Sequence, residues 1–159
     1  MTLTATSSAL PLMSKQEAAA LVIAAKTRLG LTWASIAAAL DSPVAWSTAA
    51  LLGQHPVPPE IAQRAAELLE LGDDAAVAFA MQPTRGALET AVPTDPTMYR
   101  FYEVLQVYGP TIKALIHEEF GDGIMSAINF KLDIARRADP NGDRVVVTLD
   151  GKFLPYQWG

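Results

Sequence analysis

The sequence predicts an α+β fold, in which a helical bundle of the repressor type precedes a small domain of helix and β-hairpin. Apolar residues recur at helical spacing through residues 14–82, whereas they alternate with other residues over 124–134. An Asn-Gly turn signal at 141–142 then leads into a second apolar run, as in a hairpin. The expected segments are a disordered tail (1–13), the bundle (14–82), a linker (83–93) and the second domain (94–159).

The bundle is expected to contain five helices. Ser14 followed by Glu17 is a capping-box signal for the start of the first helix, and Gly30 ends it. Thr32 offers a capping hydroxyl to the second helix, and Pro43 suits the first turn of the third. The expected helices cover residues 14–29, 32–40, 43–52, 58 to 69 or 71, and 73 to just before 83.

Residues 31–53 resemble a helix-turn-helix, in which Ile36 and Ala37 would pack against a recognition helix. The function class that this suggests is operator binding. The charges argue against it, because no Lys or Arg occurs between Leu29 and Gln63. The recognition helix would offer only Trp46, Ser47 and Thr48. We therefore expect the bundle to serve packing and assembly, and keep a DNA-binding regulator as the alternative function.

The second domain is expected to begin with helix. Asp95-Pro96 supplies a capping carboxylate and a proline at the first helical position. Gly109-Pro110 predicts a break, followed by a second helix that Gly121 ends. The two expected helices therefore lie on either side of residues 109–110.

A β-hairpin is expected to follow. In the alternating run, Ile124, Ser126, Ile128, Phe130, Leu132 and Ile134 would share one face of a strand. The return strand is expected at 145–149, with a turn at Asp150-Gly151 and a possible short strand at 152–154. So few elements bury little apolar area by themselves. We expect an obligate oligomer in which two copies intertwine.

Composition excludes several classes of protein. The 159 residues are 50% hydrophobic and carry a net charge of −5, which argues against disorder and against general nucleic-acid binding. There is no cysteine, and the two histidines, His55 and His117, are far apart and show no metal-ligand spacing. We expect a cytoplasmic protein, because no apolar run is long enough for a membrane span and residues 1–13 lack the Lys or Arg of a targeting signal.

Three side chains are candidates for chemistry. Arg100 and Glu103 stand three residues apart on a predicted helix, so they can touch. From spacing alone, they form an ordinary exposed ion pair. Ser126 places a hydroxyl on an apolar strand face, and taken alone it fills a tight spot with its hydroxyl bonded to a backbone carbonyl. The residues by themselves leave a catalytic site and these structural roles both open.

Residues 92–155 resemble the cyanases, or cyanate hydratases, and residues 49–54 resemble them more loosely. The family's catalytic Arg, Glu and Ser fall on Arg100, Glu103 and Ser126. The motifs that carry the resemblance are Pro93-Thr-Asp-Pro-Thr-Met-Tyr-Arg-Phe-Tyr-Glu103, Leu105-Gln-Val-Tyr-Gly109, Lys113-Ala-Leu115, Phe120-Gly-Asp-Gly-Ile124, Ser126-Ala-Ile-Asn-Phe-Lys131 and Leu149-Asp-Gly-Lys152.

The resemblance implies a lyase that decomposes cyanate with bicarbonate to carbamate and carbon dioxide, after which carbamate yields ammonia and carbon dioxide. It further implies a homodecamer built from five dimers, with active sites shared among subunits and no metal or organic cofactor. Glu103 would either orient Arg100 or, if protonated, deliver a proton to cyanate. A protein that only assembles, without turnover, remains a third interpretation.

Overall fold

The computed structural model describes residues 13–86 and 90–157, and the chain divides at residue 86 into two compact units. We call residues up to 86 the bundle unit and the residues after them the hairpin unit. The expected disordered tail lies outside the described residues, apart from Met13, which packs against the core of the bundle unit. No single helix in the described ranges is long and apolar enough to cross a membrane, although the bent pair of the first two helices passes on length and composition.

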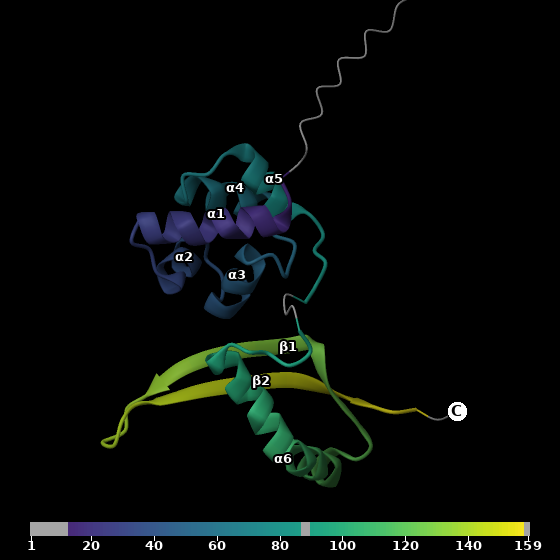
Figure 1. Ribbon diagram of the computed structural model, residues 1–159. Helices are drawn as coiled ribbons and strands as arrows, with labels where there is room; N and C mark the ends of the chain where they lie inside the picture. Colours follow the sequence, from purple (N-terminus) through teal and green to yellow (C-terminus); the bar gives the residue numbers. More distant parts are fainter. Residues whose placement is uncertain (1–12, 87–89, 158–159) are drawn as a thin grey trace, which may run out of the picture. The chain divides into compact units, whose positions relative to one another are not determined.

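The bundle unit contains the five expected helices (Figure 1). The Ser14 hydroxyl accepts a hydrogen bond from the Glu17 backbone N–H, and the Glu17 carboxylate accepts one from the Ser14 N–H, which confirms the capping box. Thr32 caps the second helix in the same way. The helices are α1 (Lys15–Arg28), α2 (Trp33–Ala39), α3 (Val44–Leu51), α4 (Pro59–Leu68) and α5 (Asp73–Ala80).

The bundle unit buries its own core. All five helices contribute to it, and the largest fully buried side chains are Phe79, Ile36, Leu51, Leu69 and Val22. The Lys15 ammonium donates to the backbone carbonyls of His55 (3.1 Å) and Phe79 (2.8 Å), so it ties the start of α1 to two distant segments. Burial lowers the pKa of this ammonium.

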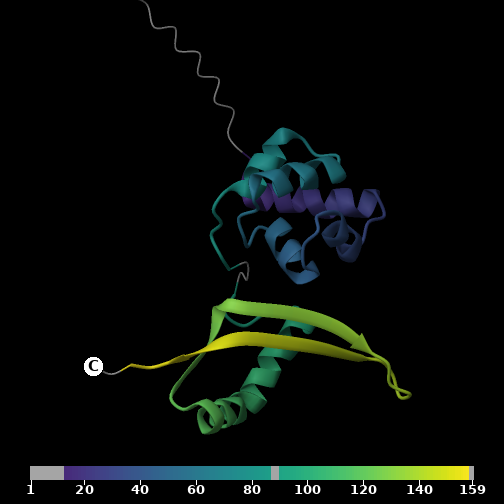
Figure 2. The same ribbon diagram turned by 180° about the vertical axis from the view of Figure 1, so that it is seen from behind.

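The hairpin unit consists of α6 (Pro96–Phe120) and the antiparallel strands β1 (Gly123–Arg137) and β2 (Arg144–Pro155). In both views the helix crosses the hairpin obliquely and then extends beyond the edge of the strands (Figures 1 and 2). Asp95 caps the helix by accepting from the backbone N–H groups of Thr97 (2.9 Å) and Met98 (3.0 Å), as the sequence predicted.

The expected break at Gly109-Pro110 is wrong, because α6 runs through both residues as one helix. Proline removes one backbone donor and crowds the preceding turn, which can bend a helix without ending it. The ribbon of α6 accordingly changes direction along its length (Figures 1 and 2).

The two strands pair with a shift in register that the sequence did not reveal. Met125 pairs with Phe153 and Phe130 pairs with Gly151, so the four residues 126–129 of β1 stand opposite Lys152 alone. The expected turn at Asp150-Gly151 is therefore wrong, since both residues lie inside β2. This bulge adds three residues to β1. Because side chains alternate between faces with a period of two, an odd number of added residues moves every later side chain of β1 to the face opposite the one that simple alternation predicts.

The expected single face from Ile124 to Ile134 is consequently wrong. Residues that pair directly across two strands lie on the same face, as do residues two or four positions apart on one strand. Ile124 pairs with Leu154 and Lys131 pairs with Asp150, and Leu154 and Asp150 are four positions apart on β2. Ile124 thus shares a face with Lys131, whereas Phe130, Leu132 and Ile134 lie on the opposite face. Met125 lies on that opposite face too, because its partner Phe153 is two residues from Gly151.

The hairpin unit leaves most of its apolar surface uncovered in a single chain. Among its described residues, only Pro93, Gly123 and Ser126 are buried, and α6 buries none. The exposed large apolar side chains include Phe101, Leu105, Tyr108, Ile112, Leu115 and Phe120 of α6, and Leu132, Ile134, Val145 and Leu149 of the strands.

Candidate active site

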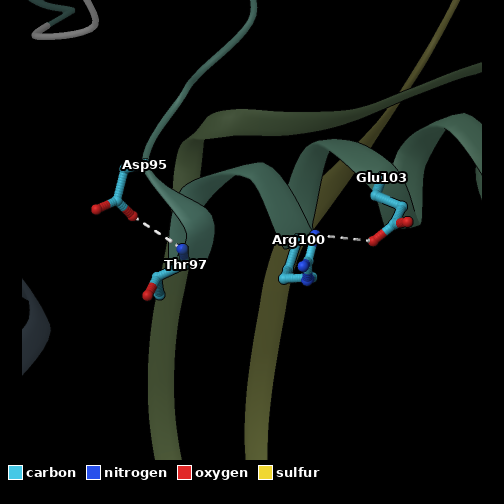
Figure 3. Close-up of polar contacts among 4 residues, drawn as sticks. All are labelled: Asp95, Thr97, Arg100 and Glu103. Atoms are coloured by element: carbon cyan, nitrogen blue, oxygen red, sulfur yellow. Dashed lines mark hydrogen bonds and ion pairs between the residues drawn. The ribbon is translucent and has the colours of Figure 1, made fainter.

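Arg100 and Glu103 form an ion pair on α6, as their spacing predicted. An Arg100 guanidinium nitrogen (Nη1) lies 3.4 Å from Glu103 Oε2 (Figure 3). The two side chains are 67% and 52% exposed, and an exposed pair of this kind contributes only about 0.2–1 kcal/mol. In the part of the chain that the structure describes, the guanidinium has no other hydrogen-bond or ion-pair partner. Most of its donors are therefore available to an incoming anion.

Ser126 lies inside the bulge and is only 5% exposed. Its hydroxyl oxygen accepts hydrogen bonds from the backbone N–H groups of Ile128 (3.1 Å) and Asn129 (3.0 Å). The expected bond from this hydroxyl to a backbone carbonyl is not found among the described residues, where the hydroxyl acts only as an acceptor within the loop. A hydroxyl has two acceptor lone pairs and one donor hydrogen. With both lone pairs engaged, Ser126 has only its hydrogen to offer, and an anion oxygen is a natural acceptor for it.

Gly151 allows the bulge to lie against β2. A Cβ at this position would overlap the Ser126 carbonyl oxygen and the Met125 side chain, so only glycine permits this close approach. Sequence reasoning assigned Gly151 to a turn and missed this role. The available signal was a glycine inside an otherwise β-forming run, which often marks a bulge or a close backbone approach.

The structure does not join the three candidate residues within one chain. Among the described residues, no hydrogen bond or ion pair links Ser126 with Arg100 or Glu103. The described residues also contain no group of three or more His, Cys, Asp or Glu side chains arranged to hold a metal ion. His117 lies in the last turn of α6.

Family models match both units. A model described as "Cyanate hydratase, N-terminal" matches residues 15–83, and one described as "Cyanate lyase C-terminal domain" matches residues 90–158. A "Cyanate hydratase" from Mycolicibacterium vanbaalenii is 61% identical over 146 residues, which cover 92% of this chain and 95% of that protein. The chain belongs to the cyanate hydratase family.

Other members of the cyanate hydratase family agree with this assignment. A relative from Methylobacillus flagellatus is 54% identical over 145 residues, covering 91% of this chain and 99% of that protein. A crystal structure of cyanase from T. urticae matches with a TM-score of 0.77 and 39% identity, covering 87% of this chain and 96% of that one. This similarity confirms the α+β fold with a helical N-terminal part.

The DNA-binding alternative gains no support from these relatives or from the bundle unit. Ile36 and Ala37 are buried between helices as expected, but Ser47 is also buried and the Thr48 hydroxyl donates to the Val44 carbonyl (2.8 Å). Of the three side chains that a recognition helix would offer, one is thus buried and another bonds back to its own helix. For a cyanate hydratase, the bundle is better explained as a packing domain.

Proposed function

We propose that this protein decomposes cyanate in a bicarbonate-dependent reaction, with Arg100, Glu103 and Ser126 in the active site. Cyanate, bicarbonate and one proton give carbamate and carbon dioxide, and carbamate with a second proton gives ammonia and carbon dioxide. The observation that carries this proposal is the buried Ser126 hydroxyl, whose two acceptor positions are filled by backbone N–H groups. Family membership supports cyanate as the substrate.

Charge repulsion is the main obstacle that the site must overcome. Holding two monoanions about 3.5 Å apart costs roughly 5 kcal/mol at an effective dielectric constant of about 20. Arginine offers a planar pair of donors that suits the carboxylate-like bicarbonate. The weak, exposed pair with Glu103 leaves Arg100 able to reorient toward these anions. Ser126 would donate to an anion oxygen, and holding the reactants together lowers the barrier further.

Assembly is part of the proposal. Among the described residues no hydrogen bond joins Ser126 and Arg100, and the hairpin unit exposes apolar side chains of both α6 and the strands. We therefore propose intertwined dimers, five of which form a homodecamer, in which neighbouring chains bring their guanidinium groups to a shared pocket. The proposal places this assembly in the cytoplasm and requires no metal or organic cofactor. Sedimentation of the purified protein measures the size of the assembly.

Glu103 is proposed to orient Arg100 rather than to donate a proton. A third negative charge beside two anions is unfavourable unless the carboxylate is paired or protonated. The 3.4 Å ion pair favours the orienting role. The variant Glu103→Gln separates the two roles, because an amide keeps a hydrogen bond to arginine but cannot supply an acid proton. Near-normal turnover of Glu103→Gln eliminates proton donation.

The decisive experiment measures ammonia release from cyanate with and without added bicarbonate. We expect turnover only when bicarbonate is present, and a decrease in kcat/KM on the order of a hundredfold for Arg100→Lys, which loses the two-pronged geometry. Arg136→Lys is the matched control, since Arg136 forms a similarly exposed ion pair with Asp143 at 3.6 Å. Absence of ammonia release refutes the function, and wild-type kinetics in Arg100→Lys refute the role of the arginine.

A further inference from the structure

A polar hollow lies beside the bulge, on both strands of the hairpin. It has a volume of about 270 Å³ and is lined by Asn129, Phe130, Lys131, Asp150 and Lys152. Lys131 pairs directly with Asp150, and Lys152 stands opposite the bulge two residues further along β2. Paired residues and residues two apart share a face, so the three charged side chains lie on the same face of the hairpin. We call this feature the lysine hollow.

The lysine hollow carries unneutralised positive charge. Within the described ranges, neither Lys131 nor Lys152 has an ion-pair or hydrogen-bond partner, although Asp150 is their neighbour. The other end of the hairpin is different, because there Arg136 pairs with Asp143 (3.6 Å) and Arg144 with Asp139 (3.5 Å). Two ammonium groups and one carboxylate leave one net positive charge in the hollow, in a chain whose net charge is −5.

The hollow is directly connected to the candidate catalytic serine. Asn129 lines the hollow, and its backbone N–H donates to the Ser126 hydroxyl at 3.0 Å. A water molecule occupies about 30 Å³ in the liquid, so the hollow has room for a small anion with part of its hydration shell. Clefts with charge of one sign also raise the local concentration of the opposite ion.

We propose that Lys131 and Lys152 form an entry site that collects a small monoanion, cyanate or bicarbonate, and delivers it to Ser126. The inference rests on the proposed function, since it assigns this collecting step to the same reaction. The lysines bind and position the anion without reacting with it. Asp150 limits the affinity, so that the anion can leave for the catalytic pocket.

A binding experiment tests the entry site without turnover. The probe is azide, a linear monoanion, titrated by calorimetry into the complete assembled protein. Substituting both lysines (Lys131→Gln with Lys152→Gln) should weaken azide binding on the order of tenfold, and Asp150→Asn should strengthen it by a few-fold, because the two changes alter the local charge in opposite directions. The same responses in the Arg100→Lys background would separate the hollow from the catalytic pocket.

Arg137→Gln is the matched control for these variants. Arg137 lies on the same strand and the same face as Lys131, six residues away, or about 20 Å along the strand. The Arg137→Gln substitution removes one positive charge outside the lysine hollow, so the affinity for azide should not change. An equal loss of affinity in this control would show a general charge effect and overturn the proposal.

Steady-state kinetics identify the anion that is collected. In the double lysine variant, the KM of that anion should rise on the order of tenfold while kcat stays within about twofold. The pair Lys131→Arg and Lys152→Arg should restore the KM, since the charge returns. Unchanged KM values for both anions, together with unchanged azide affinity, would falsify the entry site. If the double glutamine variant does not assemble, the other two variants test the entry site. Stronger azide binding by Asp150→Asn and a wild-type KM in the arginine pair would support it, and unchanged or weaker azide binding by Asp150→Asn would overturn it. Failure of the proposed function would give a different result. The wild type would release no ammonia from cyanate, while the lysine substitutions would still weaken azide binding.

Discussion

The bundle unit and the hairpin unit solve the burial of apolar side chains in opposite ways. The bundle unit surrounds its largest apolar residues, such as Phe79 and Leu69, with five short helices. The hairpin unit has a helix of 25 residues and two long strands, yet α6 contains no buried residue. The elements that carry the candidate active site are therefore the ones whose apolar side chains a single chain leaves uncovered.

This difference links stability to function. A unit with its own core can fold as an isolated chain, whereas exposed apolar faces of this extent mark an interface. With the proposed active site on the hairpin unit, we expect turnover to require assembly. Variants in the two units should consequently change different measurements.

The largest effect on stability is expected in the bundle unit. Phe79→Ala in α5 should lower the free energy of unfolding by about 3–5 kcal/mol, because it leaves a cavity in the buried core of the bundle unit. Urea unfolding followed by tryptophan fluorescence measures this, since Trp33 and Trp46 both lie in the unit. The control is Val77→Ala on the exposed side of the same helix, which should change the value by less than about 1 kcal/mol. An equal decrease in the free energy of unfolding for Phe79→Ala and Val77→Ala would show that Phe79 does not belong to the core of the bundle unit.

The next effect is expected on assembly. Ile134 is 63% exposed in the single chain, and Ile134→Glu would place a charge in the proposed interface between copies. The expected cost is about 3 kcal/mol, which corresponds to roughly a hundredfold weaker association. Sedimentation and ammonia release should decrease together. Ile23→Glu in α1, at a position 51% exposed, is the control and should leave both unchanged. An intact, active Ile134→Glu assembly would contradict the proposed interface.

A smaller effect is expected at the bulge. Gly151→Ala should reduce kcat by about tenfold, because the new Cβ pushes the Ser126 carbonyl and displaces the hydroxyl. Gly109→Ala is a helical control with nothing within 4 Å of the added carbon, and alanine there should raise stability by up to about 1 kcal/mol. Thermal unfolding and kinetics on both variants check the contrast. Normal kcat in Gly151→Ala would mean that the serine loop does not depend on this glycine.

The smallest effect is a pH dependence of the bundle unit. Burial, followed by the positive charges of Arg85 and Lys15, lowers the pKa of His55, which also stacks on Trp46. Because the folded-state pKa lies below the unfolded value of about 6.5, the folded state disfavours protonation. Stability present above about pH 6.5 should therefore be lost as the pH falls through the folded-state pKa. Melting temperatures between pH 5 and 8 should show this loss in the wild type, and a smaller one in His55→Gln.

Local signals in the sequence predicted the helix boundaries well. The capping groups Ser14, Thr32 and Asp95 act on backbone donors two or three residues away, so the interaction and its signal lie in the same short window. The ion pair of Arg100 and Glu103 was predictable for the same reason, since one helical turn fixes both positions. Their assignment to catalysis, like that of Ser126, remains a prediction.

Long-range pairing was not predictable from the sequence. The alternation over residues 124–134 looks continuous, but the register depends on which residues of β2 stand opposite. The Ser126 hydroxyl accepts two hydrogen bonds because the bulge turns two backbone N–H groups toward it, and nothing in the sequence indicated these contacts. Pro110 was misread because proline weakens a helix locally, whereas the flanking turns decide whether the helix continues.

The bulge at residues 126–129 also interrupts the alternation of β1 side chains between the two faces of the hairpin. Its odd surplus of three residues is what gives Ile124 and Phe130 opposite orientations, although their spacing alone would align them. Each end of β1 is held by its own partners on β2, so both ends keep their faces whatever the number of residues between them. The length of this loop is thus restricted by the two backbone N–H groups that must reach the Ser126 hydroxyl, and not by the orientation of the strand ends.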